Sequence, residues 1–179
     1  AEPSFGTFAL RMTLCHMVTY WLFGMAAFLL ADYGSLFRSE GYALLMRPVS
    51  SKWVAAGPAL QFVRGLIFAA ALYPFRSVIL GTPRGCPKLR ALLLGVAILW
   101  TARPAPGPVE GFLYTTIHPL RQLIGLPEVV LQTLALSLAL VGWHRRPHRA
   151  WGIVMGALTV LLVLFSVAGV LKPRPGAFR

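Results

Sequence analysis

Acidic side chains are scarce in this sequence, and charged residues of both signs are few. Asp and Glu number five among 179 residues, and the four charged types together make up 12% of the chain. Soluble domains carry about 25% charged residues. Hydrophobic residues make up 57% and the mean hydropathy is +0.69, so the polar side chains are too few to cover the apolar ones in water. The composition excludes an ordinary soluble domain and predicts an integral membrane protein.

Cysteine is also rare, and the usual catalytic motifs are missing. Cys15 and Cys86 form no CxxC pair, so we expect two unpaired thiols and no redox motif or metal site. The sequence contains no GxSxG, HExxH, P-loop, GxGxxG or CxxCH motif, and no aspartate inside an expected span. An intramembrane hydrolase, metalloprotease or phosphotransferase therefore has no residues to use, and a non-enzymatic function is favoured.

Long apolar runs define the expected fold class. Crossing a hydrocarbon core of about 30 Å takes roughly 20 apolar residues, and a helix satisfies its own backbone groups in lipid. We predict an all-α, polytopic membrane helical bundle that forms a single domain over residues 1–179. It has about five transmembrane helices, or four if the weakest does not cross. The expected spans are 8–31, 54–80, 89–102, 126–143 and 150–171.

Two of these spans have unusual features. In 89–102, the uninterrupted apolar stretch between Arg90 and Arg103 is only about 12 residues long, so it crosses only if both arginines extend to the headgroups. The span 54–80 contains Pro58 and Pro74, and we expect a kinked helix there.

Two connecting segments combine polar and apolar residues. Residues 36–47 suit a short helix lying in the membrane interface. Residues 109–125 follow the break RPAPGPVEG and are interrupted by Pro119, with Pro127 just beyond, so we place them at the interface or in a re-entrant loop.

The formal net charge of +12 raises the question of nucleic acid, but the basic residues gather in short links between apolar runs. That distribution suits anionic lipid headgroups, so membrane lipids are expected partners and nucleic acid is not. With the basic links 81–90 and 144–149 on the cytoplasmic side, five spans place the N-terminus inside and the C-terminal tail outside. The expected location is a bacterial inner membrane. The start, AEPSFGTF, has no basic region or cleavage site, so we expect the first apolar run to be retained.

Arg64 is the most informative single residue because it lies about ten residues inside its span. An arginine at that depth costs at least ~2.5 kcal/mol unless it meets protein, water or an opposite charge. Glu110 and Glu128 are the acids expected near membrane depth on the same side. We therefore predict that Arg64 pairs with one of them.

A set of polar residues in the 109–125 segment has helical spacing. Glu110, Tyr114, His118 and Arg121 are spaced by four, four and three. On one helix they would lie within about 80° of one another and could bind an anion, a quinone headgroup or a proton-carrying group. Pro119 opposes a continuous helix here. Contact with headgroups and water, an ion-pair network with Arg64, and a ligand or proton site all stay open.

His16 lies inside the first span, where a histidine can ligate haem or relay protons. Haem ligation by two histidines needs a second one at similar depth, and the other histidines fall outside the expected spans. We therefore do not expect haem, the cofactor stays unidentified, and a hydrogen-bonded packing histidine is the favoured interpretation. The other histidines are His118, His144 and His148.

Small residues mark two candidate packing faces. Gly152 and Gly156 form a GxxxG motif, and Gly65 with Ala69 forms a looser version. Such residues let helix backbones approach closely, either within the chain or against another subunit.

Three functional hypotheses follow. The favoured one is a small non-catalytic membrane subunit that packs within a larger or homo-oligomeric complex. The first alternative is a small transporter or channel, with a path on the outer side lined by Arg64, Glu110, His118 and Glu128. The second is a lipid- or quinone-linked membrane enzyme in which Tyr114 and His118 take acid-base roles.

Overall fold

The structure is a computed structural model and describes residues 2–39, 41–99 and 109–172. Over these ranges the chain is helical and contains no strand. Four segments are long and apolar enough to cross a membrane: Phe5–Leu30, Lys52–Leu80, Pro119–Arg145 and Arg149–Leu171. The predicted class, a helical membrane bundle, is therefore confirmed.

The elements follow one another as short and long helices. They are α1 (Phe5–Leu30), α2 (Tyr33–Arg38), α3 (Tyr42–Leu45), α4 (Lys52–Leu72), the 3-10 helix η1 (Tyr73–Phe75), α5 (Arg76–Leu80), α6 (Gly85–Leu94), the π-helix η2 (Gly95–Leu99), α7 (Val109–Tyr114), α8 (Pro119–Leu123), α9 (Leu126–Arg145) and α10 (Arg149–Leu171). The helices expected over 126–143 and 150–171 correspond to α9 and α10.

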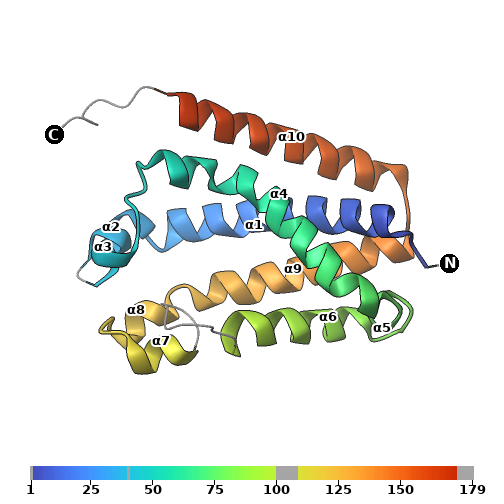
Figure 1. Ribbon diagram of the computed structural model, residues 1–179, viewed down its shortest axis with the longest axis horizontal. Helices are drawn as coiled ribbons and strands as arrows, with labels where there is room; N and C mark the ends of the chain where they lie inside the picture. The colour runs from blue at the N-terminus through green and yellow to red at the C-terminus, as the bar shows by residue number, and fades with distance from the viewer. Residues whose placement is uncertain (1, 40, 100–108, 173–179) are drawn as a thin grey trace.

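The long helices lie alongside one another and alternate in direction (Figure 1). One end of the bundle, here called the basic end, holds the N-terminus and the links 81–84 and 146–148. The opposite end, called the far end, holds α2, α3, α7 and α8 (Figure 1). This grouping is the one expected for a chain that passes along the bundle five times.

The expected third span is partly described. Residues 85–99 form α6 and η2, which run alongside α9 in the opposite direction (Figure 1), with Leu89 and Leu93 buried. At ~1.5 Å per residue this stretch is about 21 Å long, shorter than a hydrocarbon core of about 30 Å. Residues 100–102, including Trp100, and Arg103 lie outside the described residues, so a full crossing stays a prediction.

The expected kinks of the second span have clear causes. Pro58 lies inside α4, where its ring removes an N–H donor and displaces the carbonyl one turn earlier. Figure 1 shows α4 changing direction along its length. At Tyr73–Phe75, around Pro74, the helix tightens into η1 before α5 continues. Proline therefore divides this span into pieces of different direction.

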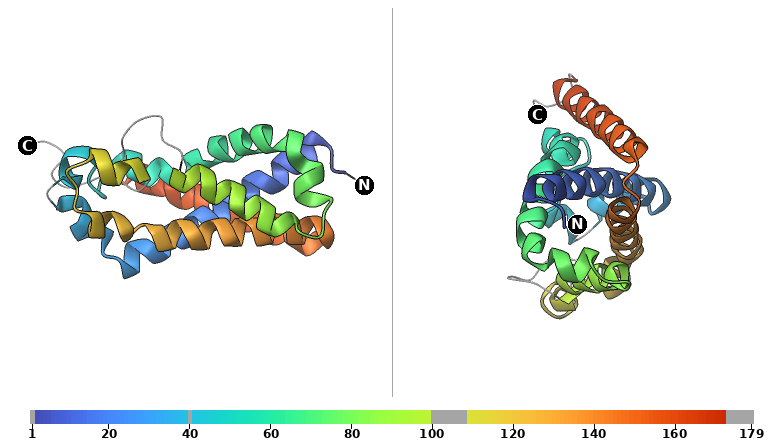
Figure 2. Two further views of the ribbon diagram at one scale, coloured as in Figure 1. Left: turned by 90° about the horizontal axis from the view of Figure 1, so that it is seen from below. Right: turned by 90° about the vertical axis from the view of Figure 1, so that its right-hand side faces the viewer.

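The core forms around α1, which lies among α4, α9 and α10 (Figure 2). Phe8, Met12 and Cys15 of α1 are buried with Ala69 and Leu140 of its neighbours. The three residues of α1 are apolar and lie on one side of the helix. Their burial holds α1 at the centre of the bundle.

At Gly65 and Ala69, α4 crosses α1 closely. A Cβ added to Gly65 would lie 2.8 Å from the Cα of Thr13, and Ala69 is fully buried. This pair therefore packs within the chain, where the missing side chain lets two backbones approach.

Each of the two connecting segments forms two short helices and not one continuous helix. The helix expected over 36–47 is replaced by α2 and α3, separated near Gly41, whose φ of 86° interrupts the helical path. Before α2, Asp32 also has positive φ, and its carboxylate accepts a hydrogen bond from the Ser35 N–H. The segment 109–125 likewise divides into α7 and α8.

Candidate functional site

The four polar residues with helical spacing do not lie on one helix. Tyr114 ends α7, and His118 caps α8, its Nδ1 accepting a hydrogen bond from the Leu120 N–H at 3.3 Å. Pro119 explains the break, since the residue before proline is pushed out of helical geometry and His118 has ψ 131°. The four residues therefore form no continuous helical stripe, and Pro119 is the residue that opposes it. The side chain of Glu110 lies outside the described residues.

Gln122 organises this region instead, a role that the sequence did not indicate. It is 2% exposed, and its Nε2 donates to the carbonyls of Gly111 and Ile117 and to the hydroxyl of Thr115, at 3.1, 2.9 and 3.1 Å respectively. These bonds join α7, the connection and α8. A lone glutamine in a semi-polar segment carries no spacing signal that would have revealed this role.

Glu128 lies in the first turn of α9 and contacts two other elements. The Tyr33 hydroxyl of α2 donates to its Oε2 at 2.5 Å, and a Cβ added to Gly24 of α1 would lie 3.5 Å from its Oε1. Burial, and then the bond to Glu128, raises the pKa of Tyr33 above its ordinary value. The carboxylate therefore joins α1, α2 and α9 at the far end.

A second tyrosine makes a parallel contact. The Tyr42 hydroxyl of α3 donates to the backbone carbonyl of Arg121 at 3.3 Å, and burial raises the pKa of Tyr42. The Arg121 side chain is exposed and has an interaction partner of its own. Together the two tyrosines fasten the α2–α3 segment to the α8–α9 segment.

Arg64 does not form the expected pair with Glu128. Its side chain is exposed, its guanidinium lies 5.5 Å from the centre of the Phe68 ring, and it makes no ion pair in the part of the chain that the structure describes. Tyr20 of α1 lies between the two along the bundle, within electrostatic range of both Arg64 and Glu128. Pairing with Glu110 stays a prediction because that side chain is not described.

His16 is a packing histidine, as expected. It is 2% exposed, and its Nε2 lies 3.2 Å from Oε1 of Gln61 on α4. Because an amide oxygen only accepts, Nε2 carries the proton. The ring also meets Phe68 edge-on, with centroids 5.0 Å apart. Its Nδ1 and the Thr13 hydroxyl have no hydrogen-bond partner within the described ranges.

The GxxxG motif of α10 packs on another helix of this chain at only one of its two glycines. Gly152 faces the Trp143 ring, 3.6 Å from where a Cβ would stand, and Gly156 has nothing within 4 Å. Only Thr159, Leu162 and Ser166 of α10 are buried. The alternative that this face meets another subunit therefore stays a prediction.

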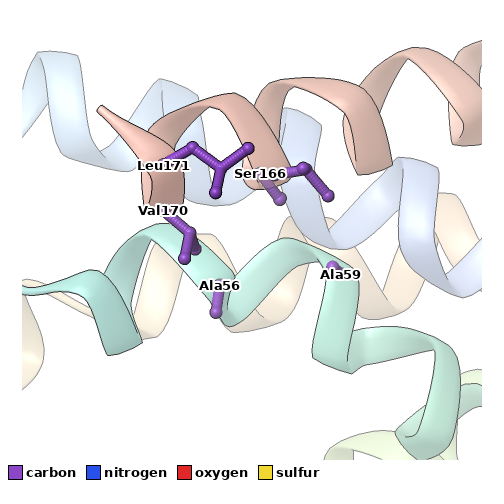
Figure 3. Close-up of a pocket in the computed structure, with 6 residues that line it drawn as sticks. Ala56, Ala59, Ser166, Val170 and Leu171 are labelled. Atoms are coloured by element: carbon purple, nitrogen blue, oxygen red, sulfur yellow. The ribbon is translucent and has the colours of Figure 1, made fainter. Parts of the chain in front are cut away.

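Two shallow cavities lie away from these residues. A groove of about 170 Å³ between α4 and α10 is lined by Ala56, Ala59, Ser166, Val167, Val170 and Leu171 (Figure 3). A second, of about 260 Å³ at the basic end, is lined by Glu2, Pro3, Arg76, Leu80, Gly81 and His144, with Glu2 and Arg76 ion-paired at 2.8 Å. Neither cavity is lined by Arg64 or by the other polar residues singled out above.

Metal-ligating side chains do not cluster: no three His, Cys, Asp or Glu residues in the described ranges lie close enough together to hold an ion. The fold defines a helical membrane protein whose long-range polar contacts lie at both ends of the bundle and, at His16 and Gln61, within the spans. Comparison with protein-family models, with curated proteins and with solved structures finds no match to this chain.

Proposed function

We propose that this chain is a small non-catalytic integral membrane subunit that packs within a larger or homo-oligomeric membrane protein complex. Arg64 carries the proposal. It is exposed in the middle of a span and has no ion pair in the described part of the chain. An arginine facing lipid at that depth costs at least ~2.5 kcal/mol, and contact with another chain removes that cost.

The outer face of α10 supports the same function. Its GxxxG motif is left open at Gly156, and large apolar side chains such as Ile153 and Val160 are 70% and 60% exposed. Small residues flanked by apolar ones allow close helix contacts in a membrane, where packing rather than hydrophobicity drives association.

We further propose that the protein lies in a bacterial inner membrane with its N-terminus in the cytoplasm. The observation behind this orientation is that the basic links lie at the same end of the bundle as the N-terminus (Figure 1). Lys and Arg near span ends favour the cytoplasmic side and meet anionic headgroups there. The residues concerned are Arg84, Lys88, Arg90, Arg145, Arg146 and Arg149.

Mass measurement of the intact particle tests the proposed function. The protein is extracted from its native membrane in mild detergent and weighed with detergent subtracted. We expect a protein mass well above 19.6 kDa, the mass of one chain. A particle of one chain, obtained even when the membranes are cross-linked before extraction, would contradict the proposal.

A small transporter or channel is the second candidate, because polar groups lie buried within the spans. His16 and Gln61 form a hydrogen-bonded pair between α1 and α4, and the His16 Nδ1 has no partner among the described residues. Ion or proton flux into vesicles holding the purified chain tests this function. It predicts flux that is lost in Arg64→Ala while assembly is unchanged, and an absence of flux in wild-type vesicles would exclude it.

A further inference from the structure

We infer that Arg64 docks a carboxylate carried at mid-membrane depth by a helix of a different protein chain, not by a second copy of this one. The inference rests on the proposed function as a membrane subunit and deepens it by naming the chemistry of the partner. It concerns the exposed side chain of Arg64 on α4, close to the half-buried Tyr20 of α1.

Depth selects a carboxylate over a lipid phosphate. Arg64 lies 12 residues after Lys52, the first residue of α4, or about 18 Å at 1.5 Å per residue. Half of a hydrocarbon core is about 15 Å, so this position of α4 lies near its middle. Arginines at that level pair with groups inside the membrane, and an acidic side chain on a neighbouring helix is the anion that can stand there.

The local donors fit a carboxylate. The Tyr20 hydroxyl on α1 interacts electrostatically with Arg64 and makes no hydrogen bond in the part of the chain that the structure describes. A guanidinium offers five N–H donors in a planar fork, and a carboxylate only accepts. The guanidinium can therefore hold both oxygens of one carboxylate, with the Tyr20 hydroxyl as a further donor in the same region.

A second copy of this chain lacks a suitable acid. Among the candidate spans of the described residues, the one acid is Glu128, and there it already accepts the Tyr33 hydroxyl. Glu128 lies against Gly24, whereas Phe68, beneath Arg64, contacts His16. Gly24 and His16 are eight residues apart on α1, which corresponds to about 12 Å along the helix. No acid in the candidate spans of a second copy therefore suits Arg64, and an acid on a helix of another protein is the partner that we infer.

Association with defined peptides tests the inference. The full chain, carrying a fluorophore at its C-terminus, is reconstituted in phosphatidylcholine vesicles. Acceptor-labelled Leu/Ala membrane-spanning peptides bear Glu, Gln or Leu at the centre, and energy transfer reports association. We expect the Glu peptide to associate about tenfold more tightly than the Leu peptide, as for a buried polar contact between membrane helices. The Gln peptide should fall between them.

Variants locate the contact. Arg64→Gln should abolish the preference for Glu, and Tyr20→Phe should reduce it about threefold. Arg84→Gln removes the same charge from a link outside the spans and should leave the preference intact. Circular dichroism and a monodisperse elution profile confirm that each variant is folded before it is compared.

Three results would overturn the inference. The first is equal association of all three peptides with the wild type. The second is a Glu preference that survives in Arg64→Gln, which would place the carboxylate elsewhere. The third is wild-type protein that shows no Glu preference and, in vesicles prepared with added phosphatidylglycerol, retains that lipid in the wild type but not in Arg64→Gln, which would make a lipid phosphate the occupant. The proposed function fails separately, since it depends on the mass of the native particle and not on peptide choice.

Discussion

The Tyr33 hydroxyl donates to Oε2 of Glu128 at 2.5 Å, joining two residues that lie 95 positions apart in the chain. Tyr33 belongs to the short helix α2, and Glu128 opens α9. The same carboxylate lies against Gly24 of α1. One side chain thus connects the end of α1 with the start of α9, and it holds the α2–α3 segment against the far end of the bundle.

Removing this hydroxyl should loosen the far end. Tyr33→Phe keeps the ring, which stacks on Phe37 with centroids 5.5 Å apart, and deletes only the donor. We expect the free energy of unfolding to fall by about 1 kcal/mol, the size of one hydrogen bond to a partly buried partner. Reversible unfolding in mixed detergent micelles measures it. Tyr114→Phe is the matched control, because that side chain is 68% exposed, and an equal loss there would contradict the assignment.

The same contact predicts loss of stability at high pH. Burial and the bond to Glu128 raise the pKa of Tyr33 above its ordinary value of 10, so the folded protein holds the phenol proton more tightly than the unfolded chain does. This contribution is fully present below pH 10 and is lost as the pH rises through the folded pKa. Unfolding followed from pH 8 upward should show a steeper decline for the wild type than for Tyr33→Phe. If the stability of the two proteins fell in parallel as the pH rises, the prediction would be refuted.

The close crossing of α1 and α4 should not tolerate a side chain at Gly65. In Gly65→Ala the new Cβ would meet the Thr13 backbone at 2.8 Å, so the helices must separate, at a cost of about 1–3 kcal/mol. Gly57→Ala on the same helix is the control, since nothing lies within 4 Å of its added Cβ. Thermal unfolding in detergent should rank Gly65→Ala below both the wild type and Gly57→Ala.

A substitution at Gly156 tests assembly separately from the folding of the single chain. A Cβ there meets nothing within 4 Å, so Gly156→Leu should change the unfolding free energy of the single chain by less than about 0.5 kcal/mol. If the α10 face meets another subunit, the same variant should reduce the fraction of chain recovered in the larger particle. Ile153→Leu, a conservative change at an exposed position, controls for altered lipid contact. Unchanged assembly in Gly156→Leu would remove α10 from the interface.

Much of the fold was determined by the sequence alone, because bilayer crossing depends on local properties. Apolar length, flanking basic residues and proline positions predict α9, α10 and the bends at Pro58 and Pro74 without knowledge of any neighbour. The break at Pro119 is equally local, and it was the reason to doubt a continuous polar stripe.

The site depended on tertiary structure. Helical spacing cannot say which faces meet, so it did not reveal that Glu128 is held by Tyr33 or that Gln122 joins α7 to α8. It also paired Arg64 with an acid by depth alone, whereas the packing of α1 against α4 leaves that guanidinium exposed over Phe68. Hydropathy is a property of each segment by itself, but a polar contact needs two segments placed together, and only the packed bundle decides that.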